Sequence, residues 1–291
     1  MPASGCDGSK AGLRRRMARL KLSFGFSWRL GGSLRERTRL FYHAWLKPRL
    51  VFRGYRAYAP ERVLCFSARL TRHRKIQFHA RDNGLDVGTF AEFFSAQYQV
   101  LPPELPPLEP KVIYDIGANI GVASLYFSAR YPGTRFYGFE PLPANYEVCR
   151  LNYRNLEHSE VYPWAVGAQE ATTWFQFREQ DPRGGQISSK TMPGGALDKR
   201  IEVQVFSLAE IIRTKGLAPP DFLKIDVEGA ELDVLKGLGE GGRTVRRMLI
   251  ETHGEHLEEE CLKWLRGNGF VVRHLDEAAP GYAAVWCDRA G

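Results

Sequence analysis

The sequence predicts a doubly wound α/β domain, with a mostly parallel sheet, over residues 110–291. Short apolar runs that suit buried strands alternate there with segments of helical periodicity. One of these runs leads into an acid and a glycine-rich turn at 115–121, and two later runs also end in acids. Strands that alternate with helices form a parallel sheet covered on both faces. Ligands bind such sheets at the carboxyl ends of the strands.

The expected elements of this domain alternate along the chain. We expect strands at 111–116, 134–139, 160–166, 222–227, 246–252, 270–275 and 282–287, with added strands at 172–177 and 201–206. We expect helices at 120–131, 143–155, from Ser207, at 230–238 and at 255–267. Pro143 suits a first helical turn, and Ser207 with Glu210 three residues later forms a capping box, so two of these helices have recognisable beginnings.

A basic N-terminal extension, residues 1–80, precedes the larger domain, residues 81–291, whose core starts at about residue 110. The extension is expected to be partly disordered at 1–32, to form a basic helix over 33–50 that is capped by Ser33 and ends before Pro48, and to form strands at 63–68 and 75–80. A helix is expected at 87–98, and a proline cluster at 101–110 indicates a boundary.

The charge is concentrated at the N-terminal end. Residues 1–81 hold 20 Lys or Arg and 3 Asp or Glu, a balance of +17, so the rest of the chain carries −9 of the total of +8. A basic segment of this kind suits peripheral contact with an anionic membrane or glycan. A solvated, arginine-rich face explains the same composition. No nucleic-acid motif accompanies the arginines, so nucleic acid is the least favoured partner.

The bulk composition is that of a globular protein, with 44% hydrophobic and 25% charged residues. The five cysteines are scattered and form no C-x-x-C pair, which argues against a zinc ribbon and a disulfide framework and favours a reducing, cytoplasmic location. Arg29 ends the apolar patch at 22–28 too early for a spanning helix. That patch is expected to be a disordered leader or a weak interfacial anchor.

The strongest local signal is the turn D-I-G-A-N-I-G at 115–121, after a buried strand. Gly117 lets the backbone approach a ligand, and Gly121 permits close packing of helix and strand. A dinucleotide site would instead read G-x-G-x-x-G and face a pyrophosphate. Asp115 repels a pyrophosphate but suits a cation. The alternative is that the glycines only form a tight turn.

Acids also end three of the following strands. Glu140 lies 19 residues after Gly121, at a position where a carboxylate can accept both hydroxyls of a ribose. Asp226 and Glu228 are two apart, as are Glu251 and His253, so each pair shares a face of extended backbone. If these two strands are neighbours, their polar groups converge near the expected cofactor. Structural roles for a lone histidine and surface carboxylates remain open.

These segments resemble the FkbM family of S-adenosylmethionine-dependent methyltransferases. Five motifs occur in the family's order: D-I-G-A-N-I-G (115–121), G-F-E-P-L-P-A-N-Y (138–146), S-L-A-E-I-I (207–212), D-F-L-K-I-D-V-E-G-A-E (221–231) and I-E-T-H (250–253). The resemblance begins weakly near Asp86 and covers most of the chain beyond it. It implies a doubly wound, seven-stranded, Rossmann-like methyltransferase sheet and O-methylation of a sugar, glycan or secondary-metabolite hydroxyl.

The resemblance and the turn chemistry together nominate the site residues. The candidate cofactor-binding residues, for S-adenosylmethionine, are Asp115, Gly117, Ala118, Asn119, Gly121, Glu140 and Asp226. The candidate catalytic residues are His253, Asp226 and Glu228. His253 is the preferred base, because its ordinary pKa is nearest neutrality. The less favoured alternative is a divalent metal held by Asp226 and Glu228, with or without His253. The polar loop at 181–196 is a candidate for sugar binding.

Two other functions remain to be separated from methyl transfer. A nicotinamide-dependent oxidoreductase would also use an acid such as Glu140, although its G-x-G-x-x-G turn is missing. A non-catalytic module could use the basic extension to bind an anionic membrane or glycan, with an affinity that falls steeply with salt. The acidic turn at 226–229, D-V-E-G, differs from the (Asn/Asp)-Pro-Pro-aromatic turn of N-methylating enzymes, which weighs against an amine acceptor.

Overall fold

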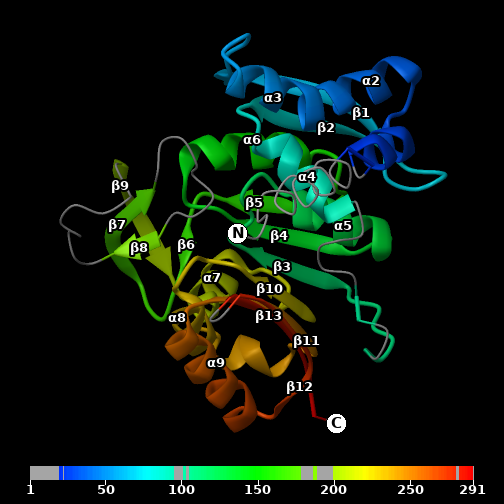
Figure 1. Ribbon diagram of the computed structural model, residues 1–291. Helices are drawn as coiled ribbons and strands as arrows, with labels where there is room; N and C mark the ends of the chain where they lie inside the picture. Colours follow the sequence, from blue (N-terminus) through cyan, green and yellow to red (C-terminus); the bar gives the residue numbers. More distant parts are fainter. Residues whose placement is uncertain are drawn as a thin grey trace, which may run out of the picture. The chain divides into compact units, whose positions relative to one another are not determined.

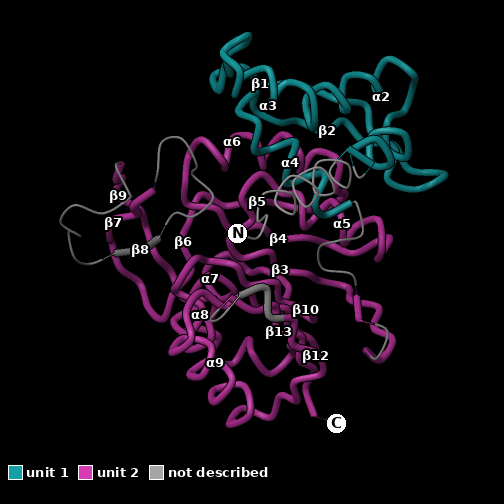
Figure 2. Tube along the Cα trace, viewed as in Figure 1, with its two compact units in different colours: residues 1–100 teal, residues 101–291 magenta. Residues whose placement is uncertain are grey.

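A computed structural model of the protein describes residues 20–21, 23–94, 101–102, 105–177, 186–188, 199–279 and 282–290. The chain divides into two compact units, residues 1–100 and 101–291 (Figure 2). The division coincides with the start of the proline cluster and lies after the predicted boundary at residue 80. Residues 81–94 group with the first unit because Phe90 packs on Phe26 and Phe78, and Arg81 pairs with Asp86.

The first unit consists of helices beside a two-stranded antiparallel sheet. Its labelled elements are α2 (Leu34–Phe41), the π-helical η1 (Tyr42–Leu46), α3 (Lys47–Phe52), β1 (Ala59–Arg69), β2 (Lys75–Asp82) and α4 (Asp86–Phe94). Residues 23–30 are also helical, with Phe26 and Leu30 buried, so this part of the expected disordered leader is ordered. Ser33 caps α2 as predicted, because its hydroxyl accepts the backbone N–H of Glu36.

The first helix does not end before Pro48, which corrects the sequence-based boundary. The chain passes from α2 through a π-helical turn into α3, which carries Pro48 in its first turn. Proline cannot donate the hydrogen bond that an α-helix would direct to residue 44, and the wider π turn directly before it accommodates this loss. The basic segment is therefore one continuous helical stretch as far as Phe52.

The second unit contains the predicted α/β domain (Figure 1). In chain order its first elements are β3 (Val112–Ile116), α5 (Val122–Arg130), β4 (Arg135–Phe139), α6 (Pro143–Tyr153), β5 (Glu160–Tyr162), β6 (Ala165–Val166), β7 (Ala171–Phe177), β8 (Gln186–Ser188) and β9 (Lys199–Phe206). They are followed by α7 (Leu208–Lys215), β10 (Phe222–Ile225), α8 (Glu231–Lys236), η3 (Gly239–Arg243), β11 (Arg247–His253), α9 (Glu255–Gly267), β12 (Phe270–Ala279) and β13 (Tyr282–Arg289). The predicted helices and strands are found, with two corrections: the strand expected at 160–166 is divided into β5 and β6, which belong to different sheets, and the loop expected at 181–196 contains β8.

Seven strands form the main sheet, in the order β12-β13-β11-β10-β3-β4-β5. β3, β4, β5, β10 and β11 pair in parallel, and β13 is antiparallel to both of its neighbours, β11 and β12. The mostly parallel, seven-stranded, doubly wound architecture is therefore as the sequence predicts. The added strands at 172–177 and 201–206 lie in a separate four-stranded sheet, in the order β6-β9-β7-β8.

Helices cover both faces of the main sheet, as a buried parallel sheet requires. On one face α7, α8 and α9 pack Leu208, Val234 and Leu265 against apolar residues of the strands. Figure 1 shows these three helices together on one side of the sheet. On the other face Phe127 of α5 meets Phe222 of β10 at a centroid distance of 5.1 Å. Apolar strand residues face the helices on both sides of the sheet, which explains why the strands appear in the sequence as continuous apolar runs.

This topology places the functional motifs together. The strand order reverses at β3: the chain builds β4 and β5 on one side of it and β10 and β11 on the other. A crevice for ligands forms at the carboxyl ends of the strands where the order reverses. The turns after β3, β4, β10 and β11 therefore meet at one edge. Within the described residues no helix has the length and apolar character needed to cross a membrane.

Candidate active site

The turn after β3 is held against the next strand by its backbone. Gly117 and Ala118 both donate their N–H groups to the carbonyl of Phe139, at 3.0 Å each. Asn119 has a positive φ of 50°, and its N–H donates to Glu140 Oε2 at 2.8 Å. The turn and the end of β4 are thus one hydrogen-bonded assembly, in which the backbone of the glycine turn orients the predicted ribose-binding acid.

Gly117 brings this assembly into contact with β10. Its φ is +75°, and a Cβ atom built on it would lie 1.8 Å from the carbonyl oxygen of Asp226. Only glycine permits this approach of two backbones. Gly121 has a different role, because a Cβ atom there would lie 3.1 Å from Cys149 Sγ, and it begins α5 with a φ of +80°. Gly121 therefore sets helix packing.

Glu140 is buried, with 4% of its surface exposed, and lies at the pocket between β3 and β4. Its Oε1 accepts the N–H of Leu142 at 2.9 Å and the side-chain amide of Asn145 at 3.4 Å. Burial raises the pKa of Glu140 to about 7, although the N–H donors of Leu142 and Asn119 act in the opposite direction. The carboxyl group is held in one orientation and can still accept hydrogen bonds from a ligand.

The pocket is open to solvent, and its empty space, with that solvent included, is about 560 Å³. Four of the predicted cofactor-binding residues line it: Gly117, Asn119, Glu140 and Asp226. Its other lining residues are Ile116, Phe139, Pro141, Asn145, Trp164, Ala165, Val166, Phe175, Val227 and Glu228. Among these described residues the ionisable groups are three carboxylates, and none is Lys or Arg. The pocket combines an apolar, aromatic wall with an anionic end.

Asp115 does not line the pocket, in contrast to the predicted position beside the cofactor. It is 1% exposed and accepts the Ser124 hydroxyl at 2.7 Å. Its Oδ1 lies 3.5 Å from Lys224 Nζ. Burial raises the pKa of Asp115, and the Lys224 charge opposes that shift. Ala118, at 3% exposure, is also outside the lining and contributes through its backbone. Asp115 therefore acts beneath the turn, as the partner of a buried lysine.

Lys224 connects three parts of the site from its position in β10. Its Nζ donates to the Gly117 carbonyl at 3.1 Å and to Asp226 Oδ2 at 3.2 Å, besides the approach to Asp115. Burial lowers the pKa of Lys224, but the charges of Asp226 and Asp115 outweigh it and raise the pKa overall. This lysine is charged, and its partners fix the relative position of the β3 turn and the β10 terminus.

β10 and β11 are neighbours, which meets the condition set by the sequence, and Asp226 and Glu228 converge with His253. His253 Nε2 lies 3.4 Å from Glu228 Oε2 and 3.9 Å from Asp226 Oδ1. All three side chains are half-buried. Glu228 has a positive φ of 54°, so the turn that presents it is strained for a residue with a side chain. Asp226 and Glu228 also line the pocket, which places this cluster at its anionic end.

Glu231 contacts the ring nitrogen of His253 that is farther from Glu228. Its Oε1 lies 2.8 Å from His253 Nδ1 and also accepts the Gly229 N–H at 3.0 Å. Burial lowers the pKa of His253, but the Glu231 hydrogen bond and the charges of Glu228 and Asp226 outweigh it and raise the pKa to about 9. The ring is thus protonated near pH 7 in this arrangement. The ordinary pKa that favoured His253 as the base does not apply here.

The comparisons with known proteins agree with this geometry. Residues 115–276 match the family described as the Methyltransferase FkbM domain, which is more than half of the 291 residues. The chain belongs to the FkbM methyltransferase family. The protein is thus an enzyme of the methyltransferase class, and the resemblance based on five motifs is confirmed.

Three relatives illustrate the similarity. Methyltransferase sdnD of Sordaria araneosa is 31% identical, and the match covers 60% of this chain and 79% of the relative. The 31-O-demethyl-FK506 methyltransferase FkbM of Streptomyces tacrolimicus is 29% identical, covering 55% and 73%. The 2-O-methyltransferase NoeI of Sinorhizobium fredii is 27% identical, covering 51% and 65%. A solved FkbM methyltransferase from Methylobacillus flagellatus aligns with a TM-score of 0.43 and 16% identity, covering 70% of this chain and 54% of that one.

The FkbM match begins at Asp115 and ends at residue 276, so it includes every predicted site residue. Sequence reasoning missed Lys224 and Glu231, although both stand in the quoted motif at 221–231. A lysine inside an apolar strand and an acid at the start of a buried helix were the available signals. Trp164 and Phe175 of the pocket wall were also missed, because aromatic residues there are expected in any core. The loop residues Ser189 and Lys190 lie outside the described residues.

Proposed function

We propose that the protein transfers the methyl group of S-adenosylmethionine to a hydroxyl oxygen of a sugar, glycan or secondary metabolite. The observation that carries the proposal is the anionic pocket at the carboxyl ends of β3, β4 and β10. Its described lining includes Glu140, Asp226 and Glu228 but no Lys or Arg. S-adenosylmethionine has a positive sulfonium and a positive ammonium group, so it matches this charge. The pyrophosphate of a nicotinamide dinucleotide does not.

Residues of the pocket fit three parts of this donor: the ribose, the adenine ring and the ammonium group. Glu140, fixed by Asn119 and Leu142, can accept the ribose hydroxyls. Phe139 and Trp164 offer apolar surface to an adenine ring. Asp226, with one oxygen on Lys224, is expected at the ammonium end. Gly117 and Asn119 border the same space through the backbone of their turn. Asp115 supports these groups from below by holding Lys224.

The chemistry of transfer needs few functional groups. S-adenosylmethionine supplies an electrophilic methyl group on a sulfonium, which is already a good leaving group. The S–CH₃ bond breaks, an O–CH₃ bond forms, and the acceptor hydroxyl loses its proton. Positioning of the hydroxyl therefore contributes most of the rate enhancement. Asp226, Glu228 and His253 stand at the anionic end of the pocket, where they can bind the hydroxyl and direct its proton away.

The names of two relatives support oxygen as the acceptor atom. One relative is a 31-O-demethyl-FK506 methyltransferase and another is a 2-O-methyltransferase. The turn D-V-E-G at 226–229 is consistent with this choice, because it lacks the two prolines and the aromatic residue of the (Asn/Asp)-Pro-Pro-aromatic turn. A hydroxyl acceptor also agrees with the two acids at the pocket end, because carboxylate oxygens accept hydrogen bonds from hydroxyl groups.

Isothermal titration with S-adenosylhomocysteine and with NAD tests the cofactor assignment. We expect S-adenosylhomocysteine to bind and NAD to give no heat. Glu140→Ala should weaken the binding of S-adenosylhomocysteine by at least tenfold, because the loss of a hydrogen-bonded charge costs about 1.5–3 kcal/mol. Asp233→Asn, which removes an exposed acid from α8, is the matched control. Binding of NAD alone would contradict the proposal.

Incubation with methyl-labelled S-adenosylmethionine tests the acceptor class. Fractionated cellular glycans, lipids and small molecules serve as acceptors. The labelled product is then treated with base, because a methyl ether survives this treatment. Label in a methyl ether supports transfer to a hydroxyl. Label confined to protein or nucleic acid would contradict the acceptor class while leaving the cofactor assignment intact.

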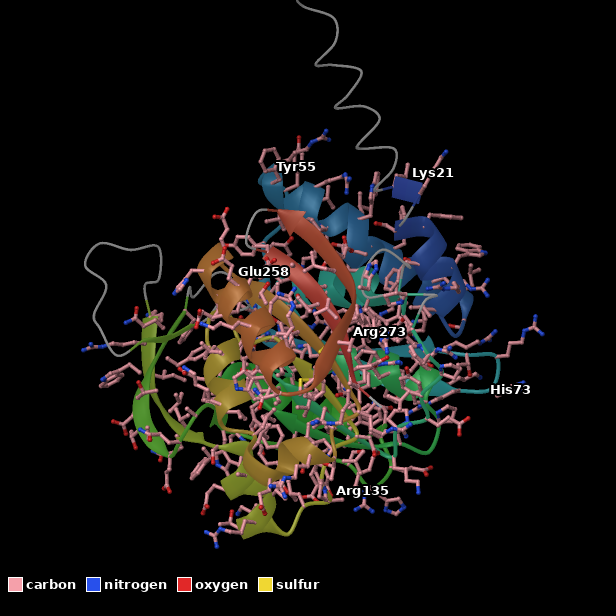
Figure 3. The ribbon with its side chains drawn as sticks, turned by 90° about the horizontal axis from the view of Figure 1, so that it is seen from below. Lys21, Tyr55, His73, Arg135, Glu258 and Arg273 are labelled. Atoms are coloured by element: carbon pink, nitrogen blue, oxygen red, sulfur yellow. The ribbon has the colours of Figure 1, made fainter. Side chains whose placement is uncertain are left out.

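We also propose that the basic first unit contacts an anionic membrane surface at its periphery. Large apolar side chains are exposed there between arginines: Phe24, Trp28, Leu34, Phe52 and Tyr55, of which Phe52 is 93% and Tyr55 73% exposed. Figure 3 labels Tyr55, which belongs to this unit. Aromatic side chains beside a balance of +17 over residues 1–81 match the interfacial and the anionic parts of a bilayer surface.

A further inference from the structure

Three potential metal ligands meet at the anionic end of the pocket, where β10 and β11 end side by side. They are Asp226 Oδ1, Glu228 Oε2 and His253 Nε2, and one ligand atom from each lies within 4.8 Å of the others. The two distances from His253 Nε2 are 3.4 and 3.9 Å. Around a cation with bonds of about 2.1 Å, ligand atoms lie roughly 3.0 Å apart when adjacent and roughly 4.2 Å when opposite. The spacing therefore suits a common cation.

The histidine is oriented as a ligand would be. Its Nδ1 is hydrogen-bonded to Glu231 Oε1, so Nε2 is the nitrogen that faces the two other acids. A carboxylate on the far nitrogen is the usual support for a metal-binding histidine, because it fixes the ring and increases its basicity. Glu231 is itself fully buried, at 0% exposure. Sequence spacing does not reveal this pair, since it joins two different elements.

Glu231 also supplies an independent sign of a missing positive charge. Its Oε2 is buried, and among the described residues none forms a hydrogen bond with it. A buried carboxylate oxygen without a partner is costly unless nearby charge compensates for it. Three carboxylates, from Asp226, Glu228 and Glu231, surround His253, whose protonated ring balances one of them, whereas Lys224 is bound to the opposite oxygen of Asp226. A divalent ion that replaces the proton on Nε2 would balance the remaining excess.

We propose that Asp226, Glu228 and His253 bind one divalent cation of the Mn²⁺ class, with Glu231 as the positioning residue. One imidazole nitrogen and two carboxylate oxygens form a mixed ligand set that first-row divalent ions accept. Three protein ligands leave positions open for water or for an acceptor oxygen. The site lies at the pocket, because Asp226 and Glu228 belong to its lining.

The consequence for catalysis rests on the proposed function. An acceptor hydroxyl that coordinates the ion loses its proton more easily, because the cation stabilises the alkoxide. The proton passes to solvent, the oxygen forms its bond to the methyl group, and the sulfur keeps the electron pair of the broken bond. No electron transfer is involved, so the ion serves to bind and polarise the acceptor. Acceptors with two neighbouring hydroxyls, as in sugars, could occupy two open positions.

Titration of the metal-free protein with Mn²⁺, followed by electron paramagnetic resonance of the free ion, tests the site directly. We expect one Mn²⁺ per chain for the wild-type protein. Asp226→Asn and His253→Ala should each weaken binding by more than about 100-fold. Glu231→Gln should weaken it by about 10–100-fold, the range for a supporting hydrogen bond. Asp233→Asn, on the same helix as Glu231 but exposed, should bind as the wild type does.

Two controls keep the result decisive. Circular dichroism of each variant confirms folding, and Glu228→Gln, a near-isosteric change, replaces any variant that fails to fold. No binding by the wild type at 1 mM Mn²⁺ (about 4 kcal/mol of affinity) would overturn the site. Equal binding by wild type and by Asp226→Asn, His253→Ala and Glu228→Gln would do so as well, because the ion would then be elsewhere.

A parallel titration with S-adenosylhomocysteine in the presence of a chelator separates this proposal from the proposed function. Binding of S-adenosylhomocysteine without Mn²⁺ binding would overturn the metal site alone. Mn²⁺ binding without S-adenosylhomocysteine binding would support the site and contradict the cofactor. Loss of Mn²⁺ in His253→Ala with unchanged affinity for S-adenosylhomocysteine is the expected pattern, because His253 is outside the pocket lining.

Discussion

Gly117 is the residue on which the geometry of the pocket depends most. Two constraints act on it: a φ of +75° and the carbonyl oxygen of Asp226, which lies where a Cβ atom would be. Gly133 has the same backbone constraint, with a φ of +81°, but a Cβ atom there would meet nothing within 4 Å. Alanine substitutions at the two glycines therefore separate the cost of a left-handed backbone from the cost of steric contact with Asp226.

We expect Gly133→Ala to lower the free energy of unfolding by about 1–2 kcal/mol, the cost of a left-handed conformation for alanine. Gly117→Ala should lower it by about 1–3 kcal/mol more, because the β3 turn must move away from β10. It should also abolish S-adenosylhomocysteine binding. Urea denaturation and calorimetric titration measure these effects. Equal stability of the two variants would show that the contact with Asp226 is not limiting.

Glu140 gives the site a pH dependence. Burial raises its pKa to about 7, whereas the unfolded value is near 4.5. A raised pKa means that this group stabilises the fold below pH 4.5 and that the contribution is lost as pH rises through 7. Ribose binding depends on pH in the opposite direction and strengthens as the pH rises, because the ionised carboxylate is the hydrogen-bond acceptor.

We therefore expect the affinity for S-adenosylhomocysteine to be roughly tenfold lower at pH 6 than at pH 8, following the ionised fraction of a group with a pKa of about 7. Titrations at several pH values, at constant ionic strength, measure this slope. Glu140→Gln should bind more weakly and should lose most of the pH dependence. A wild-type slope that persists in Glu140→Gln would assign the dependence to another group.

At the scale of elements, β10 is the strand that joins the two halves of the site. Lys224 in its interior holds Gly117, Asp115 and Asp226, so the strand connects the cofactor turn with the anionic cluster. Asp115 is 1% exposed, and its Oδ1 has no hydrogen-bond partner among the described residues. Loss of the lysine would leave that acid buried without its counter-charge.

We expect Lys224→Met to lower the free energy of unfolding by about 3–5 kcal/mol, the cost of breaking a buried ion pair from one side. The double variant Lys224→Met/Asp115→Asn should recover a large part of that loss, because it removes the isolated charge. Urea denaturation of the two variants gives both values. If the double variant is no more stable than the single one, the pairing of Lys224 with Asp115 is not what the lysine provides.

Elements were the best-predicted level of the structure. α9 spans Glu255–Gly267, the range expected from its periodicity, and Ser207 caps α7 through the Glu210 N–H as its capping box predicts. These features depend on neighbouring residues only. The helix across Pro48 was not predicted, because a π turn depends on how the segment packs. The site shows the same difference: the acids that line the pocket were predicted, whereas Lys224 and Glu231, which hold the site from inside the fold, were missed.

At the scale of the whole molecule, charge separates along the chain. The basic first unit exposes the aromatic side chains of Phe24, Trp28, Phe52 and Tyr55, and the second unit carries the pocket. We expect the protein to sediment with vesicles that contain phosphatidylserine in 50 mM NaCl, and to be released in 500 mM NaCl. Phe52→Ser should lower the partition coefficient by about tenfold, since a buried Phe is worth ~1.5–3 kcal/mol.

Trp174→Ser is the matched control for that experiment, because Trp174 is an exposed aromatic residue of the second unit. It should not change vesicle binding. Binding to neutral phosphatidylcholine vesicles that matches binding to the anionic ones would contradict an electrostatic contact. Unchanged binding of Phe52→Ser would contradict an apolar one.

The sequence by itself determined the element types, the order of the motifs and the anionic ends of the strands. Those features follow from periodicity, turn residues and caps, which act over a few neighbouring positions. The tertiary structure alone decided that Asp115 lies beneath the pocket with Lys224, and that Glu231 orients His253. Lys224 and Gly117 are 107 positions apart, and His253 and Glu231 are 22 apart. Such pairs depend on strand order and on which buried charges need partners, and local patterns do not carry that information.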